Sequence, residues 1–139
     1  MQKILLFATV LMLYGTVFAE QIHPMLMRNL KGFPVMKANL KQGVLTLVTT
    51  HGNVSHETYE DVVAEGVCAI LEKQTDRVRT KTRINRIEVL SRNGQQGYVF
   101  TDAQNACRQL SGITDPSARE TFFAGQTENH PVETDDLPP

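Results

Sequence analysis

The sequence predicts an α+β fold: a small three-stranded mixed sheet with one long helix across it, a short second helix and one disulfide. Three observations lead to this prediction. Segments of alternating apolar and polar residues lie on both sides of a long stripe of apolar residues spaced three and four apart, a tight-turn sequence separates the last two segments, and two cysteines are present. Because alternation is typical of strands and the wider spacing of helices, the predicted order is strand, helix, strand, strand, helix.

Residues 1–19 predict an export signal. Lys3 is followed by an apolar run over residues 4–17, and Val17 and Ala19 supply the small side chains that signal peptidase accepts. This run is shorter than the roughly 20 apolar residues that span a bilayer. We therefore expect a cleaved signal and no transmembrane anchor, with a mature chain that begins at Glu20 and is periplasmic or secreted.

The mature chain of about 120 residues is long enough for one domain. We expect an irregular segment over residues 20–42, the α+β domain over residues 43–116, and an acidic, proline-containing tail over residues 117–139. Apart from local docking of Phe122 and Phe123, the tail is poor in periodic apolar residues and cannot offset the entropy cost of ordering, so we expect it to be mobile from about Gly125.

The first predicted strand covers Gly43–Thr50, where β-branched and apolar residues predominate. The long helix begins after Ser55, a favourable N-cap, with carboxylates in its first turns. Gly66 lies inside the helical region and costs about 1 kcal/mol relative to Ala, which predicts that another element packs closely there. The apolar stripe of this helix consists of Tyr59, Val62, Val63, Val67, Ile70 and Leu71.

The second predicted strand runs from the basic stretch that carries Arg77 to Arg83 into residues 84–91, and the third lies at residues 97–101. Asn93-Gly94 between them favours a tight reversal, so these strands should form an antiparallel hairpin. The third strand carries no charge, whereas the cations around the second strand are typical of a sheet edge. The sequence therefore predicts a split β-α-β order with the third strand in the centre; the alternative order places the second strand there.

A capping-box pattern from Thr101 to Gln104 predicts the short second helix, which ends near Gly112. Cys107 lies on this helix, and Cys68 lies on the side of the long helix that faces away from the apolar stripe. An even number of cysteines in an exported protein favours a structural disulfide. The wide spacing does not match the C-x-x-C turn of disulfide oxidoreductases, so we expect no redox role.

A row of alternating cations leads into the second strand: Arg77, Arg79, Lys81 and Arg83. On an extended strand these side chains would share one face and form a partner-binding surface. Three interpretations remain open: a hydrated edge that resists pairing, a binding site for an envelope anion or an acidic protein, and a surface that the acidic tail covers until a partner displaces it. Nucleic acid is disfavoured because no aromatic residue interleaves with the cations.

Two clusters contain residues that can bind metals. His51 and His56 flank the loop after the first strand, but no standard zinc spacing is present. His23, Met25 and Met27 are soft ligands that suit Cu(I), although methionines also fill gaps in small cores. Exposed histidines and packing methionines are the simpler interpretation, so we expect no metal or other cofactor.

The sequence contains no nucleophile elbow and no phosphate-binding glycine loop, and its histidines lack a defined acid to orient them. We therefore predict a small exported, non-enzymatic binding or inhibitory module that acts through the basic edge strand or the loop after the first strand. The alternative is a periplasmic protein that binds copper or zinc through histidine and methionine. A homo-oligomer that forms through a sheet edge is compatible with both.

Overall fold

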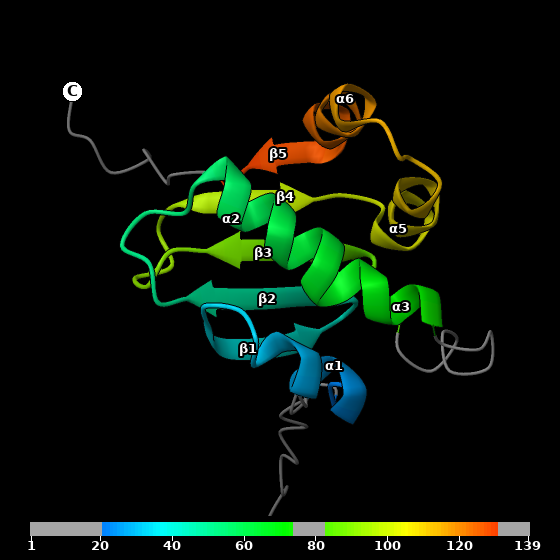
Figure 1. The fold of residues 1–139 in the computed structure, drawn as a ribbon. Coiled ribbons are helices and arrows are strands. Elements are labelled where there is room, and N and C mark those ends of the chain that lie inside the picture. The colour runs from blue at the N-terminus through cyan, green and yellow to red at the C-terminus, as the bar shows by residue number, and fades with distance from the viewer. Residues whose placement is uncertain (1–20, 74–82, 131–139) are drawn as a thin grey trace, which may run out of the picture.

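The computed structural model describes residues 21–73 and 83–130 and shows an α+β protein with two layers (Figure 1). One layer is a five-stranded mixed sheet with strand order β1-β2-β3-β4-β5. The strands are β1 (Val35–Lys41), β2 (Val44–Thr49), β3 (Arg86–Leu90), β4 (Gly97–Phe100) and β5 (Thr127–Asn129). The helical segments are α1 (Pro24–Leu30), α2 (His56–Asp61), η1 (Val62–Cys68), α3 (Ala69–Lys73), α5 (Ala103–Ser111) and α6 (Pro116–Gln126).

The strand pairing combines two hairpins, one parallel pair and one antiparallel pair whose strands are joined through α5 and α6. β1 and β2 are antiparallel, and β2 pairs in parallel with β3 because the long helix α2-η1-α3 lies between them in the chain. β3 is antiparallel to β4, and β4 is antiparallel to β5. The turn between β3 and β4 contains Gly94 with a φ of 74°, so the predicted hairpin of the second and third strands is confirmed.

The core lies between the sheet and the long helix, which runs across one face (Figure 1). The whole apolar stripe that the sequence predicts is buried there, from Tyr59 to Leu71. The sheet residues in this core have no exposed surface: Leu45, Leu47, Ile87, Val89 and Phe100. The alternation of apolar residues along each strand therefore places one sheet face against the helix.

The middle of the long helix, η1, is a π-helical segment that is buried on almost every side. Glu65 is its one exposed residue. A Cβ on Gly66 would lie 3.4 Å from Leu30 Cδ2 and 3.6 Å from the ring of Phe33, so the close packing predicted at this glycine is confirmed. The elements that approach it are α1 and the turn that follows α1.

The predicted position of the third strand in the centre of the sheet is wrong. That segment is β4, and β3 lies between β2 and β4. The cation row that indicated an edge precedes Arg86, where β3 begins. The charges on β3 also have partners: Arg86 Nε lies 3.9 Å from Glu88 Oε1, and Thr46 Oγ1 donates to Glu88 Oε2 at 3.4 Å. A charged strand can lie inside a sheet when its neighbours compensate the charge.

The expectation of an irregular segment over residues 20–42 is also wrong, because α1 and β1 form there. His23 Nδ1 accepts a hydrogen bond from the Met25 N–H at 3.2 Å and caps α1, with Pro24 at the first helical position. Leu26 and Leu30, four residues apart, anchor this short helix in the core.

The sequence did not predict strand β1, because the residue pattern that indicates a strand is weak there. A bulge between Val35 and Lys37 interrupts the alternation of apolar residues. The chain then reverses at Gln42 and Gly43, whose φ angles are 51° and 78°, which are the positive values that a two-residue hairpin requires. Glutamine is not a residue that usually indicates such a turn.

The acidic tail is folded as far as the structure describes it, so the expectation of mobility from Gly125 is wrong up to residue 130. Asp115 Oδ2 caps α6 by accepting the Ala118 N–H at 2.9 Å. Phe123 is 2% exposed, with its ring centroid 5.6 Å from that of Phe100. This aromatic contact buries enough apolar surface to dock α6, and β5 then adds a strand to β4.

Three predictions concern residues outside the described ranges. They are the export signal at residues 1–19, most of the cation row at residues 77–81, and the end of the tail at residues 131–139, and they stay predictions. Within residues 21–73 and 83–130, none of the helices is long and apolar enough to cross a membrane.

Candidate functional site

The loop between β2 and α2 is held in place at the end of the sheet where β2 and β3 finish. The Val54 N–H donates to Gln96 Oε1 at 2.6 Å, and Gln96 Nε2 donates to Val54 O at 3.1 Å. The Arg92 N–H donates to His51 O at 2.8 Å. Ser55 Oγ then accepts a backbone N–H from the first turn of α2. The start of α2 therefore has a fixed position relative to the sheet.

A cleft of about 440 Å³ opens beside this helix start, between α2, α6 and β5. Its walls combine residues that are distant in the sequence: His56, Tyr59, Glu60, Glu120, Phe123, Ala124, Thr127 and Asn129. The lining is therefore aromatic and acidic, with a few neutral polar groups.

The aromatic residues of the cleft form a contiguous array. The His56 ring stacks on Tyr98, with centroids 4.4 Å apart and planes inclined by 29°. The Tyr59 ring lies 5.1 Å from that of Tyr98 and 6.0 Å from that of Phe123. These spacings are those of favourable aromatic pairs, so the rings support one another's orientation.

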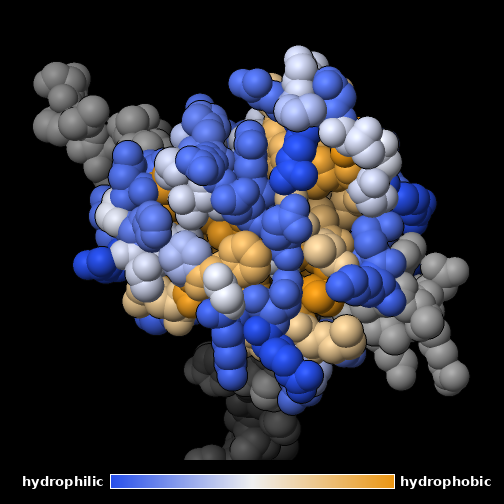
Figure 2. Space-filling view, viewed as in Figure 1, coloured by the Kyte–Doolittle hydropathy of each residue, from blue (hydrophilic) through white to orange (hydrophobic). Residues whose placement is uncertain are grey.

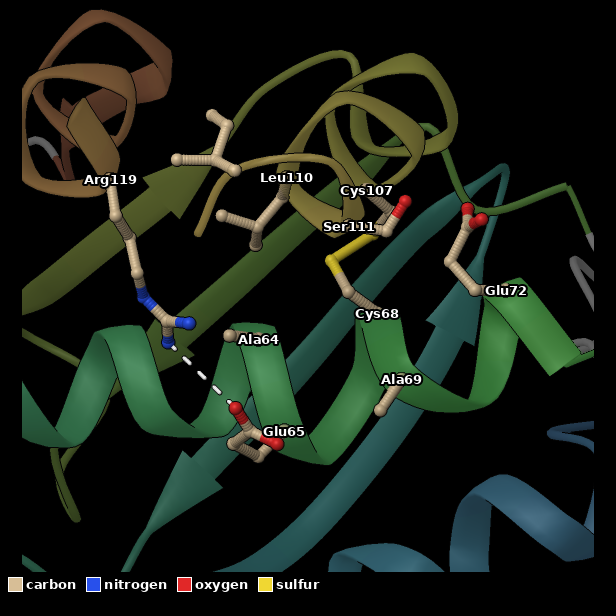
Figure 3. Close-up of a pocket in the computed structure, with 10 residues that line it drawn as sticks. Ala64, Glu65, Cys68, Ala69, Glu72, Cys107, Leu110, Ser111 and Arg119 are labelled. Carbon is tan, nitrogen blue, oxygen red and sulfur yellow. Dashed lines mark ion pairs between the residues drawn. A yellow bond between two sulfur atoms is a disulfide. The ribbon is translucent and has the colours of Figure 1, made fainter. Parts of the chain in front are cut away.

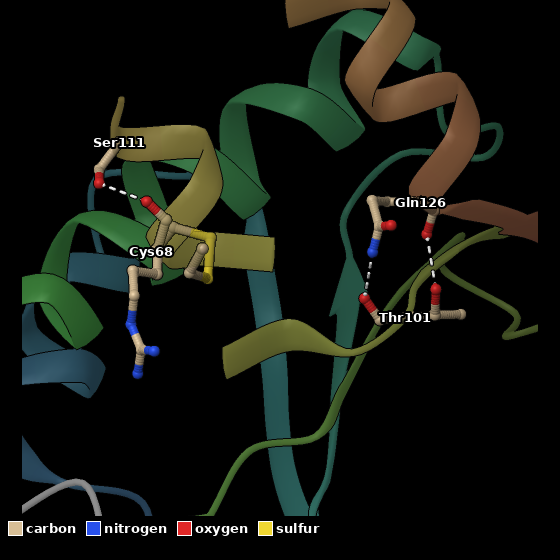
Figure 4. The surroundings of a disulfide bond; sticks show 6 residues. Cys68, Thr101, Ser111 and Gln126 are labelled. Atoms are coloured by element: carbon tan, nitrogen blue, oxygen red, sulfur yellow. Dashed lines mark hydrogen bonds between the residues drawn. A yellow bond between two sulfur atoms is a disulfide. The ribbon is translucent and has the colours of Figure 1, made fainter. Parts of the chain in front are cut away.

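The hydroxyl of Tyr59 is fixed within this array. It lies 2.8 Å from Thr127 Oγ1, at the junction of α6 and β5. The junction is itself held: Thr101 Oγ1 donates to Gln126 O, and Gln126 Nε2 donates to Thr101 O, each at 3.1 Å (Figure 4). Burial raises the pKa of Tyr59 far above its ordinary value, so the phenol stays protonated.

The carboxyl group of Glu60 has a raised pKa, and burial is the main cause. The positive charges of Arg119 and His56 oppose this rise, whereas the negative charges of Glu120 and Asp61 add to it. The cleft thus brings carboxylates from α2 and α6 close enough to influence one another. Its electrostatic character is negative, which favours a cationic ligand.

The predicted partner-binding cations are only partly described. Arg77, Arg79 and Lys81 lie outside the described residues, so their role stays a prediction. Arg83 is exposed and precedes β3 without belonging to a strand. The strand that follows is central, so the proposed basic edge strand is not the edge of this sheet.

The candidate metal ligands lie on different elements. His23, Met25 and Met27 belong to α1 or its cap, where His23 Nδ1 already accepts a backbone hydrogen bond. His56 lines the cleft, whereas His51 is exposed in the preceding loop. Among the residues that the structure describes, no group of three or more His, Cys, Asp or Glu side chains could hold a metal ion.

The predicted disulfide between Cys68 and Cys107 is confirmed, with an S–S distance of 2.09 Å and both residues buried. It links η1 to α5 and forms one wall of a groove of about 260 Å³. Figure 2 shows apolar residues along this boundary between the long helix and the α5–α6 side. Figure 3 shows Arg119 and Glu65 pointing toward each other there, with Arg119 Nη2 3.9 Å from Glu65 Oε1.

Half of the cleft comes from residues that sequence reasoning did not select. Glu120, Phe123 and Ala124 belong to the segment predicted as an acidic tail, and Thr127 and Asn129 belong to the part of it that was expected to be mobile. Asp115 followed by a proline is a typical helix start and was the available signal for α6. No local pattern indicated that Thr127 would meet Tyr59.

Comparisons with known proteins found no match to a family model, to a curated protein or to a solved structure.

Proposed function

We propose that the protein is a non-catalytic binding module that captures a positively charged group with an apolar stem, such as an arginine or lysine side chain of a partner, in the cleft between α2 and α6. One observation carries the proposal: the carboxylates Glu60 and Glu120 stand at a cleft whose other walls are packed aromatic rings. The cleft begins at the loop after the first predicted strand. That loop is one of the two surfaces that the sequence predicted to bind a partner.

The distribution of charge supports a cation in preference to an anion. Glu60 on α2 and Glu120 on α6 line the site, and the negative charge of Asp61 also acts on Glu60. Arg119 is the nearby cation, and its guanidinium already lies 5.7 Å from the centroid of Phe123 and 3.9 Å from Glu65. An anionic ligand would meet the excess of carboxylates, whereas a guanidinium or ammonium would gain charge-assisted hydrogen bonds from them.

The aromatic lining supports an apolar stem next to the charge. Tyr59 and Phe123 are 1% and 2% exposed, so they form the packed base of the cleft, and an apolar stem would contact the exposed side chains of His56 and Ala124. The volume of about 440 Å³ lies in the range of roughly 300–1,000 Å³ that is typical of sites for small ligands. The cleft can therefore accommodate one or two side chains of a partner.

The test is a titration with N-acetyl-arginine amide and with its citrulline analogue, which has nearly the same shape and no charge. We expect the arginine compound to shift the NMR signals of α2, α6 and β5, and the citrulline compound to bind at least tenfold more weakly, because a hydrogen bond to a charged group contributes about 1.5–3 kcal/mol.

The variants Glu60→Gln and Glu120→Gln should each weaken binding of the arginine compound. Glu57→Gln is the matched control, because Glu57 is an exposed carboxylate on the same helix that does not line the cleft. Equal binding of citrulline and arginine, or an equal loss in the Glu57 variant, would contradict the proposal.

A further inference from the structure

We propose that the edge of the protein formed by α1 and β1 docks on the surface of an anionic lipid bilayer. This edge of the sheet is opposite the edge formed by β5 and α6, so the docked protein would leave the acidic cleft accessible (Figure 1). The proposal does not depend on what the cleft binds.

The chain segment that forms this edge carries only positive charges, although Asp61 and Glu65 of the long helix lie beside the turn after α1. Residues 21–56 contain no aspartate or glutamate, and their cations are all exposed: Arg28, Lys31, Lys37 and Lys41. The opposite edge instead carries Asp115, Glu120 and Glu128. The chain is nearly neutral overall, so this separation gives the molecule one basic side that anionic headgroups would attract.

Exposed apolar side chains accompany these cations. In the described ranges, the large apolar residues that remain exposed are Met25, Met27 and Met36, at 44%, 40% and 47%. Met27 and Met36 line one shallow groove between α1 and β1, together with Lys31 and Lys37. Figure 2 shows strongly hydrophilic residues beside apolar ones over the lower part of the molecule, where Figure 1 places α1.

This combination suits the interface of a bilayer. Lysine can place its charge among headgroups while its aliphatic stem lies along apolar surface. Methionine is flexible and apolar, so it can enter the boundary between headgroups and acyl chains without a shaped receptor. Two signals on one surface, cations and apolar side chains, are what reversible membrane binding requires.

The geometry of β1 disfavours a second copy of the chain as the occupant. β1 is an edge strand, and Val35 pairs with Thr49 while Lys37 pairs with Val48, which leaves Met36 as the extra residue of a bulge. A bulge and edge lysines both interfere with the addition of another strand. The bulge also turns Met36 outward, where 47% of its surface is exposed.

The sequence places an apolar segment next to this edge. Residues 4–17 form the apolar run, and Pro24 begins α1. The chain from residue 17 to residue 24 reaches at most about 25 Å when fully extended. Before the predicted cleavage, the start of α1 therefore lies within this distance of the apolar run.

The test is sedimentation of the exported protein, with its N-terminus determined by mass spectrometry, in the presence of lipid vesicles. One set contains phosphatidylcholine alone, and the other contains equal amounts of phosphatidylcholine and phosphatidylglycerol. We expect binding to the anionic set only, with an affinity that decreases as salt is added, since each cation near such a surface contributes about fivefold to binding.

Substitutions identify the surface. The variant Lys31→Gln/Lys37→Gln should bind the anionic vesicles about 25-fold more weakly, and Met27→Gln/Met36→Gln about tenfold more weakly. The control Lys73→Gln/Arg108→Gln removes the same charge from exposed positions on α3 and α5 and should bind as the unmodified protein does. Thermal unfolding checks that every variant is folded.

Three results would overturn the proposal. Binding that is equal for neutral and anionic vesicles would show that lipid charge is not recognised. An equal loss in the control would show that only net charge matters. Self-association in the analytical ultracentrifuge that is lost in Lys31→Gln/Lys37→Gln, without vesicle binding, would show that a second copy occupies this edge.

Discussion

The hydroxyl of Tyr59 lies 2.8 Å from the hydroxyl of Thr127, although 68 residues separate them in the sequence. Tyr59 comes from α2 and is 1% exposed, and Thr127 is the first residue of β5. The bond therefore connects the helix layer to the last strand of the sheet, beside the acidic cleft. The raised pKa of the phenol keeps it protonated, so its proton is available to the bond.

The first prediction concerns this hydrogen bond. Tyr59→Phe removes one partner and should lower the free energy of unfolding by about 1–2 kcal/mol, because Thr127 Oγ1 loses its buried partner. Urea unfolding of Tyr59→Phe, Thr127→Val and the double variant measures the coupling, which we expect to be about 1 kcal/mol. Strictly additive losses would show that the bond does not contribute to stability.

The second prediction concerns the disulfide. Cys68→Ala/Cys107→Ala should lower the free energy of unfolding by about 4 kcal/mol, because the bridge spans 39 residues and restricts the unfolded chain. Urea unfolding with and without a reductant provides the measurement. The reductant should shift the midpoint of the unmodified protein and leave that of the double variant unchanged; a shift in the variant would indicate another cause.

The third prediction concerns Gly97 at the start of β4. A Cβ there would collide with the carbonyl oxygen of Val89 and would lie 2.9 Å from Leu90 Cα, both on the paired strand β3. Gly97→Ala should therefore cost about 3 kcal/mol, since two backbones would have to separate. Gly52→Ala is the control, because nothing lies within 4 Å of a Cβ at that position. In thermal unfolding, the midpoint of Gly97→Ala should be clearly lower than that of Gly52→Ala.

The sequence alone predicted the elements that depend on patterns of neighbouring residues. The periodic stripe from Tyr59 to Leu71 identified the long helix, and Asn93-Gly94 identified the hairpin of β3 and β4. The position of Cys68 on the far side of the helix from the stripe indicated the disulfide with Cys107. Each of these inferences depends on spacing that the backbone geometry of a helix or turn fixes directly.

The strand order and the cleft depend on partners that no local pattern shows. The cation row before β3 suggested an edge, but β3 is central, and its own charges on Arg86 and Glu88 are compensated by each other and by Thr46 on the next strand. The composition of the tail suggested mobility from about Gly125, but α6 continues to Gln126 and β5 follows it, with Phe123 docked on Phe100. In both cases tertiary contacts outweighed composition, so half of the cleft was missed.

The fourth prediction concerns the pH dependence of the cleft, where stability and binding should respond in opposite directions. The pKa of Glu60 is raised in the folded protein, so folding favours the protonated form. Its stabilising contribution is present below the pKa of the unfolded chain and is lost as the pH rises through the higher pKa of the folded state. The free energy of unfolding of the unmodified protein should therefore decrease slightly as the pH rises between these two pKa values, and that of Glu60→Gln should not.

Binding of a cation requires the ionised carboxylate, so it should strengthen as the pH rises through the raised pKa of Glu60. A bound cation should in turn lower that pKa, which the NMR titration of the Glu60 side chain with and without N-acetyl-arginine amide can measure. Glu60→Gln should bind more weakly and with a flatter pH profile, whereas Glu57→Gln should retain the full profile. A profile that persists in Glu60→Gln would assign the pH dependence to another group.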